Sequence, residues 1–486
     1  MKLLEQAQAL KPEQVIIGAG IFTAICISVG LYLDIPVIIA LPFLAVSALV
    51  LLYDYRAAYY LLMISLPWSV AYTGPGGINT DMPSEPLMLV LTACFLLSAA
   101  INKPLSWEFI SHPICRIIAL MIMWAIISSL FSVDATKSVK YILAKIWYLV
   151  TFILVTGAII KSVEDLRRIC WFFMISLAVV VAVSLVKHAA LGFAFDMVNR
   201  SVWPFFYNHV IYAAAVAMFV PFTFLLWQQA KNQFLKRLIV LGILVLFLLA
   251  IGLSYTRASW LSIPVALIYL FILRFNLTRL VLIASVISVI AAGIYLVRNN
   301  NYQLYAPDFA TTVYHGGNIE KHLEATYSLE DVSGMERVYR WVAAARMAHD
   351  NPIAGTGPNT FYPEYKKYTV SNFITYVSRN PEKSTTHNYF LMTMAEQGVP
   401  GLILFTSLVF YALLLGQRLY NQAIDKQLKQ TIVAAILSIV ITVFHLLLNE
   451  LIEVDKIGSF FYIALAILIR IDIWQRAHND LLKPAR

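Results

Sequence analysis

The sequence predicts an all-α integral membrane protein that crosses the bilayer many times and carries one folded polar cap. Of its 486 residues, 60% are hydrophobic and only 13% are charged. Uncharged runs such as residues 238–255 approach the roughly 20 residues that an α-helix needs to cross hydrocarbon. A transmembrane β-barrel would instead show short segments of alternating polarity. A single long polar insert, residues 298–386, interrupts the succession of apolar runs.

Fourteen apolar segments are candidate transmembrane helices. They are residues 14–32, 35–52, 57–72, 85–101, 114–131, 141–160, 168–190, 208–229, 238–255, 258–273, 280–297, 398–416, 429–447 and 457–473. Several are close to the minimum length for a span, so a count of 12 fits as well as 14. Either even number places both termini on the same side of the membrane.

The distribution of basic residues predicts the orientation. Lysine and arginine gather in short loops and tails on one side, as in Arg167–Arg168 and Lys236–Arg237, and the positive-inside rule makes that side cytoplasmic. Both termini are therefore expected in the cytoplasm, and the charged start, which lacks a cleavage site, is expected to be retained. The net charge of +9 is explained by topology, so no nucleic-acid partner is expected.

The insert at residues 298–386 is expected to lie on the opposite side as a folded cap. It carries nine basic and nine acidic residues, which is unlike a polybasic lipid-binding tail. A helix is predicted at about 334–350, because apolar residues recur at helical spacing, Ser333 and Glu336 have capping-box spacing, and Asn351–Pro352 ends the pattern. The chain thus divides into a bundle of 9–11 spans (1–297), the cap (298–386), and three final spans with a cytoplasmic tail (387–486).

His387 is the candidate catalytic base. If Ser384 or Thr385 caps the following helix, His387 lies in its first turn, where the helix dipole and desolvation both disfavour the imidazolium. A neutral imidazole at a helix mouth could remove a proton from a hydroxyl nucleophile. The alternative is a histidine that only hydrogen bonds across an interface.

Four arginines are candidates for binding an anionic headgroup. Arg200 and Arg257 lie at the same side of the membrane as His387, beside span ends, whereas Arg337 and Arg340 share a face of the predicted cap helix. A guanidinium suits bidentate binding of phosphate oxygens. The alternatives are lipid-anchoring arginines and, for Arg340, an intrahelical ion pair with Glu336.

A metal site is not predicted, and neither is a cofactor. The acidic residues Glu450, Glu453 and Asp455 have no accompanying histidine ligand, and His315 and His322 lack a typical zinc spacing. No phosphate-binding loop or dinucleotide fingerprint is present in the sequence.

These motifs, read in order, resemble the O-antigen ligase and polymerase superfamily. The family pattern is an arginine-bearing cap helix, a Pro-x-x-Gly-x-Gly turn, and then His-Asn followed by glycine. Here these correspond to Arg337/Arg340, the turn from Pro352 with Gly355 and Gly357, and His387–Asn388 with Gly398. The motifs cover about a third of the chain.

The resemblance implies a GT-C-like membrane glycosyltransferase that is inverting and metal-independent. Its donor would be a glycan linked to undecaprenyl diphosphate, used on the periplasmic side of the bacterial inner membrane among membrane lipids. Arg200 and Arg257 match positions that hold the diphosphate, and His387 matches the essential histidine. Asn388, Gly355 and Gly357 would support the site.

Family members differ in their acceptor. The stretch before His387 looks most like that of O-antigen ligases, which implies lipid A–core as the acceptor in lipopolysaccharide biosynthesis. An O-antigen polymerase or a protein O-oligosaccharyltransferase is the alternative within the superfamily. A flippase or transporter of lipid-linked sugars is the alternative of another class, although no internal repeat supports it.

Overall fold

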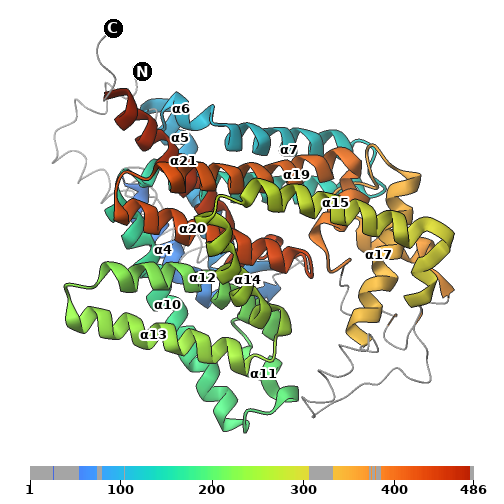
Figure 1. Ribbon diagram of the computed structural model, residues 1–486, viewed down its shortest axis with the longest axis horizontal. Coiled ribbons are helices and arrows are strands. Elements are labelled where there is room, and N and C mark those ends of the chain that lie inside the picture. The colour runs from blue at the N-terminus through green and yellow to red at the C-terminus, as the bar shows by residue number, and fades with distance from the viewer. Residues whose placement is uncertain are drawn as a thin grey trace.

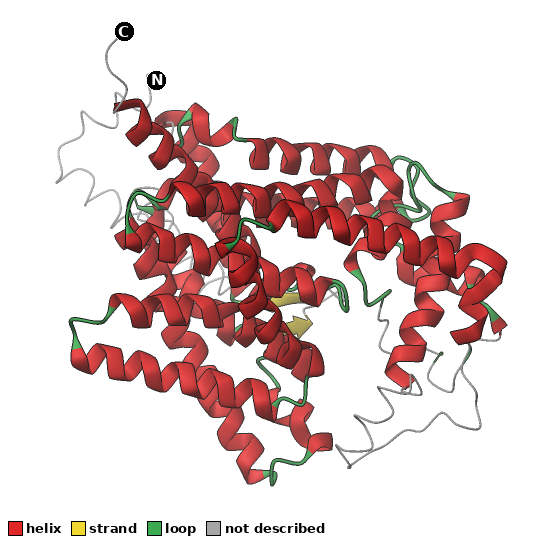
Figure 2. Cartoon of the chain, viewed as in Figure 1, coloured by secondary structure: helices red, strands yellow, loops and turns green. Residues whose placement is uncertain are grey.

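The computed structural model describes residues 54–73, 79–102, 104–305, 332–371 and 385–481, together with Cys26, Ile374 and Ser378. In these residues the protein is almost entirely helical, and only a small hairpin of two strands interrupts the helices (Figure 2). Ten of the described helices are long and apolar enough to cross a membrane. The chain is an all-α polytopic membrane protein, as the sequence predicts.

The helices and strands of the described residues fall into two halves of the chain. The first half contains α4 (Tyr55–Ser65), η1 (Leu66–Trp68), β1 (Val70–Thr73), β2 (Asn79–Met82), α5 (Ser84–Asn102), α6 (Trp107–Ile110), α7 (Pro113–Ser129), α8 (Ala135–Leu149), η3 (Val150–Val155), α9 (Thr156–Ile159), α10 (Val163–Ala190), η4 (Phe195–Met197), α11 (Val198–Val202) and α12 (His209–Gln229). The second half contains α13 (Phe234–Leu253), α14 (Arg257–Arg274), α15 (Thr278–Val297), η5 (Arg298–Tyr305), α17 (Val332–Asp350), α18 (Phe361–Glu364), η6 (Tyr365–Tyr368), α19 (Tyr389–Gln422), α20 (Lys426–Leu446), η8 (Leu451–Glu453) and α21 (Asp455–Leu481).

Helices α12, α20 and α21 form the centre of the bundle. In α21, 83% of the membrane-length window is buried, whereas none of the window of α15 is, so α15 lies at the periphery. Aromatic rings of Phe173, Phe219 and Phe460 pack together in the core, with centroids 4.3–4.9 Å apart. Such tilted and edge-on ring contacts add to the stabilisation that burial itself provides.

Local signals in the sequence explain where the long helices begin. α10 begins at a capping box, in which Ser162 and Asp165 each accept a backbone N–H near the helix start. α20 begins after Asp425, whose carboxylate accepts the N–H of Leu428 at 2.7 Å.

Two predicted spans differ from the structure, and two lie outside the described residues. The segment predicted as 57–72 is only the 11-residue helix α4, because Pro67 follows and the chain turns into the β1–β2 hairpin. The segment predicted as 398–416 begins nine residues earlier, at Tyr389. Apart from Cys26, the segments 14–32 and 35–52 fall outside the described residues, and so do His315 and His322.

The cap helix α17 lies at one end of the bundle, opposite the C-terminal end of α21 (Figure 1). It covers residues Val332–Asp350, where the sequence predicts a helix at about 334–350. Because α17 begins before Ser333, that residue is not the N-cap, and the predicted capping box is wrong. Helix α17 packs against the first part of α19, which brings the cap next to His387.

Candidate active site

His387 lies directly before α19 rather than within it. The N-cap is Asn388, whose extended backbone lets its side-chain oxygen accept the N–H of Leu391 at 3.0 Å. The prediction that Ser384 or Thr385 caps this helix, with His387 in the first turn, is therefore wrong. His387 instead adopts a left-handed backbone conformation, with φ of +53°.

The segment 385–388, which carries His387, is held from two sides. From α17, the Arg340 guanidinium donates to the carbonyl of Thr385 at 3.4 Å, and the indole of Trp341 donates to the carbonyl of Thr386 at 2.9 Å. From the other side, the Asn388 amide donates to the carbonyl of Leu447, at the end of α20, at 3.1 Å. The cap and the final helices thus fix the position of His387 together.

The surroundings of His387 favour a neutral imidazole. Burial lowers the pKa of the ring, and the positive charges of Arg340 and Arg337 lower it further. The Glu450 carboxylate and a hydrogen bond to Asn449 act in the opposite direction and raise the pKa. Glu450 Oε2 lies 4.0 Å from Nδ1 of the ring, and both side chains are about one-quarter exposed. A neutral histidine can accept a proton, and a carboxylate beside the ring can stabilise the imidazolium that results.

The two arginines of α17 differ in their surroundings. Arg340 is buried and forms an ion pair with Glu336 at 3.3 Å, which is the intrahelical pair that the i, i+4 spacing suggests. Glu336 also accepts a hydrogen bond from Ser378 at 2.7 Å, so this carboxylate has a structural role inside the cap. Arg337 is only partly buried. Arg340 thus has both a charge partner in Glu336 and a hydrogen bond to the segment that carries His387.

Arg257 and Arg200 lie on segments that meet at the same end of the bundle. Arg257 is the first residue of α14, and the hydroxyl of its neighbour Thr256 donates to the carbonyl of His209 at 3.3 Å. Asn199, next to the exposed Arg200 on α11, accepts the backbone N–H of His209 at 2.9 Å. That these arginines bind one ligand with His387 stays a prediction.

A pair of contacts connects these segments to the end of α20. Ser259 and His445 lie 3.4 Å apart, which joins the first turn of α14 to the last turn of α20. The segment after that turn accepts the hydrogen bond from Asn388. The starts of α14 and α12 and the segment 385–388 therefore surround the end of α20.

Helix α19 is interrupted at Gly398, between the short stretch that follows His387 and the rest of the helix. Gly398 adopts φ of +69°, and Pro400 has no N–H to donate. The N–H of Val399 donates instead to the carbonyl of Pro352 at 2.8 Å. The break leaves carbonyls on the preceding turn without their usual helical donors, and a buried carbonyl without a donor is costly.

Donors from the cap turn and from α7 satisfy these carbonyls. The backbone N–H groups of Thr356 and Gly357 donate to residues 395 and 396, at 3.1 and 2.8 Å, and the Trp124 indole donates to residue 397 at 2.8 Å. The glycine turn thus replaces the missing helical bonds of α19. This contact joins the glycine turn to the helix that begins after the His-Asn motif.

Glycine is required at the turn because the backbones approach closely. Gly355 and Gly357 both have positive φ, +69° and +103°, which side-chain-bearing residues rarely adopt. A Cβ at Gly355 would overlap the backbone of Glu396, and one at Gly357 would overlap Ser132. Both glycines therefore allow the turn to pack directly against its neighbours, Gly355 against Glu396 of α19 and Gly357 against Ser132.

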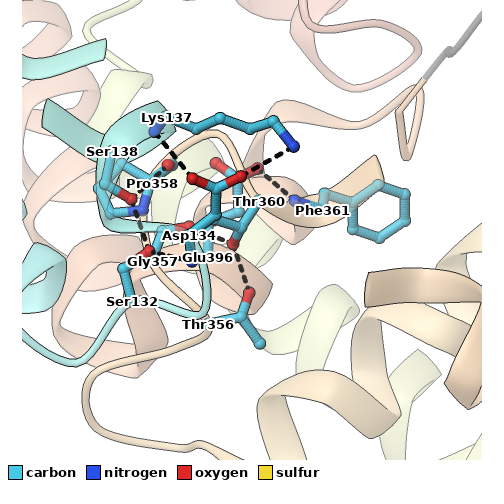
Figure 3. A network of polar contacts seen from close by, with 10 residues as sticks. All are labelled: Ser132, Asp134, Lys137, Ser138, Thr356, Gly357, Pro358, Thr360, Phe361 and Glu396. Atoms are coloured by element: carbon cyan, nitrogen blue, oxygen red, sulfur yellow. Dashed lines mark hydrogen bonds and ion pairs between the residues drawn. The ribbon is translucent and has the colours of Figure 1, made fainter. Parts of the chain in front are cut away.

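The carboxylate of Glu396 holds the residues that follow the glycine turn (Figure 3). It is buried, and it accepts the backbone N–H groups of Asn359 and Phe361, each at 2.9 Å. Ser138, on α8, adds a hydrogen bond to the carbonyl of Pro358 at 2.8 Å. Sequence reasoning overlooked Glu396, although an acidic residue at the start of an apolar segment is a signal that could have revealed it.

The acidic residues considered for a metal site have protein partners. Glu453 binds Lys145, Asp455 accepts a hydrogen bond from Ser84 at 3.1 Å, and Glu450 faces His387. Among the described residues, no group of three or more potential ligands is gathered in a way that could hold a metal ion. Sequence reasoning considered Glu450 only as a metal ligand and missed its place beside His387.

The fold and the site define a polytopic membrane protein with an enzyme-like centre under a helical cap. Residues 242–406 match the family model of the O-antigen ligase, a stretch that runs from α13 through the cap and past the break in α19. This match supports the resemblance to the O-antigen ligase and polymerase superfamily that the motifs predict. The match includes Arg257, Arg337, Arg340 and His387, but Arg200 lies before it. No curated protein matches the chain.

Proposed function

We propose that the protein is an O-antigen ligase. It would transfer a glycan from undecaprenyl diphosphate to a sugar hydroxyl of lipid A–core, on the periplasmic side of the bacterial inner membrane. The observation that carries the proposal is His387, whose pKa is lowered by burial and which lies beside two arginines and a glutamate. A base and fixed positive charges are what an acceptor hydroxyl and a diphosphate leaving group require.

In the proposed reaction, His387 accepts the proton of the acceptor hydroxyl as its oxygen attacks the anomeric carbon. The bond from that carbon to the diphosphate oxygen breaks, and the diphosphate leaves on its lipid with the bonding electron pair. Attack from the face opposite the leaving group inverts the configuration. Glu450, 4.0 Å from the ring, stabilises the imidazolium that forms.

The arginines neutralise the charge that grows on the diphosphate. Arg257 and Arg337 are the proposed ligands, with Arg200 nearer the exposed rim, since their guanidinium forks suit phosphate oxygens and keep their charge. These fixed charges can replace a metal ion. Arg340 is paired with Glu336 and donates a hydrogen bond to the Thr385 carbonyl, so it is proposed to position the segment that carries His387.

A transfer assay with purified protein tests the proposal. Undecaprenyl-diphosphate glycan is supplied with lipid A–core, with a second glycan, or with a hydroxyl-bearing peptide, in the absence of nucleotide and of an ion gradient. Transfer to lipid A–core supports a ligase, whereas transfer to glycan or peptide would identify a polymerase or a protein O-oligosaccharyltransferase. No transfer to any acceptor, with movement of the lipid across vesicles, would identify a flippase.

His387 variants test the proposed base. His387→Ala and His387→Gln should both lose about 10²–10⁴-fold in transfer rate while donor binding is retained, because the arginines hold the donor. His349→Gln is a matched control, since His349 is an 87% exposed histidine on α17 and its loss should leave transfer unchanged. An active His387→Gln would show that His387 is only an interfacial hydrogen-bonding residue.

A further inference from the structure

A polar cluster in the bundle connects to both partners of the proposed His387–Glu450 pair. Tyr389, two residues after His387, donates its hydroxyl to Glu453 Oε1 at 2.8 Å. Glu453 lies three residues after Glu450, at the end of η8. Because two or three residues span at most about 7–11 Å of chain, this hydrogen bond closes a short loop around the pair.

Lys145 anchors this connection to the bundle. Its ammonium donates to both carboxylate oxygens of Glu453, at 2.9 and 3.0 Å, and its side chain is only 7% exposed. The rings of Tyr141, Tyr148 and Tyr462 surround the ammonium with centroids 5.5–5.9 Å away. A buried ammonium held by a bidentate carboxylate and by aromatic faces has few alternative positions.

We infer that Lys145, Glu453 and Tyr389 form a brace that sets the distance between His387 and Glu450. The brace deepens the proposed function and rests on it, because it acts through the proposed base. Its members are positioning residues, since Tyr389 holds the start of α19 and Glu453 holds the end of η8.

The space beside the brace is too small for a substrate. The cavity lined by Tyr141, Lys145, Tyr389 and Tyr462 has a volume of about 20 Å³. That is room for about one water molecule. Lys145 therefore acts on the site through Glu453 rather than by contact with a sugar or a diphosphate.

Two tyrosines allow the inference to be tested with matched variants. Tyr141 also donates to Glu453 Oε1, at 3.2 Å, but it lies on α8 and is remote in the chain from His387. Tyr389→Phe and Tyr141→Phe each remove one hydroxyl and one hydrogen bond to the same oxygen. The brace predicts that kcat falls about 10- to 100-fold in Tyr389→Phe, since small misplacements of a reacting group cost rate on this scale, with KM for the donor unchanged. In Tyr141→Phe, kcat should stay near that of the unchanged protein.

A second measurement does not depend on glycan transfer. The pH dependence of diethylpyrocarbonate modification at His387, followed by peptide mass spectrometry, reports the titration of this ring in the full-length protein. Because the brace sets the distance between the ring and the Glu450 carboxylate, which raises the pKa of His387, the midpoint should change in Tyr389→Phe but not in Tyr141→Phe. Equal midpoints and equal kcat in the two variants would overturn the brace. A selective shift at Tyr389→Phe in a protein without transfer activity would support the brace and overturn the proposed function.

The ion pair itself supplies a further test. Lys145→Met or Glu453→Gln singly leaves a charge without its partner and should lower the thermal unfolding temperature, whereas the double variant should recover most of it. The brace predicts that the double variant remains at least 10-fold slower in transfer than the unchanged protein. Recovery of transfer together with stability would show that the pair only stabilises the fold.

Discussion

The imidazole of His387 should stay neutral to a lower pH than a histidine in water. Burial and the neighbouring arginines lower its pKa below the usual 6.5. Transfer should therefore be constant from pH 8 down to about 6.5 and fall only as the pH passes below the lowered pKa. A pH profile of kcat checks this expectation, with His349→Gln as the control variant. A midpoint above 6.5 would contradict it.

The same lowered pKa affects stability in acid. Below pH of about 6.5 the unfolded chain binds a proton at this histidine that the folded chain does not bind. The contribution of His387 to the free energy of unfolding should therefore decrease as the pH falls from 6.5 through the lowered pKa. A comparison of thermal unfolding in the original protein and in His387→Gln, at pH 7 and pH 5, measures this difference.

The two arginines of α17 should respond differently to substitution by lysine. Arg340→Lys should lower the thermal stability and the transfer rate together, because lysine cannot hold Glu336 and the Thr385 carbonyl with one planar fork. Arg337→Lys should lower the thermal stability less than Arg340→Lys does, because Arg337 is only partly buried, and should weaken donor binding at least tenfold. Measurements of unfolding temperature and donor affinity separate the two roles. Identical behaviour of the two variants would contradict this assignment.

Local patterns predicted part of the site, and distant contacts determined the rest. The Glu336–Arg340 pair could be inferred because residues four apart share a helix face. The approach of Glu450 to His387 joins positions 63 residues apart, and no local pattern encodes such a distance. The N-cap was misplaced because several polar residues precede α19 and any of them can cap a helix.

At the scale of elements, the glycine turn and the break in α19 form one unit. Gly355→Ala should destabilise the protein by about 1–3 kcal/mol or more, since alanine strains a left-handed position and its Cβ would overlap the Glu396 backbone. Transfer should fall with stability, because the turn satisfies the carbonyls beside the His387 segment. Thermal unfolding and transfer assays on the same preparation check both expectations.

Gly242→Ala is the matched control for this substitution. Gly242 lies within α13, where a Cβ would have no atom within 4 Å, and alanine favours the helix more than glycine. Its stability should be unchanged or slightly higher. If Gly355→Ala is as stable and active as Gly242→Ala, the close approach to Glu396 has no energetic importance.

The succession of helices followed from apolar runs, whereas their ends depended on neighbours. Runs such as 238–255 became α13 because length and apolarity alone define a span. The start of α19 at Tyr389 was missed because residues 389–397, before the break at Gly398, are too few to count as a span. Donors from Thr356, Gly357 and Trp124 satisfy the carbonyls at the end of this stretch.

At the scale of the whole molecule, the proposed chemistry depends on fixed cations rather than on a bound metal. Transfer should therefore persist in excess EDTA, because the arginines carry permanent charge and Glu450, Glu453 and Asp455 already face protein partners. The assay compares initial rates before and after chelation. Activity lost in EDTA and restored by one divalent cation would redirect attention to these three carboxylates.

The hydrogen bond from Trp124 to residue 397 has a consequence for biogenesis. It joins positions 273 residues apart, so α7 leaves the ribosome long before the segment that it will support. A nascent chain that ends before residue 397 lacks the carbonyl that accepts this hydrogen bond. The Trp124 indole therefore has no such acceptor until residue 397 has been synthesised. Assembly of the site is thus a late event of synthesis. Chains truncated within the cap should be recognised by membrane proteases, even though most of their helices are already inserted.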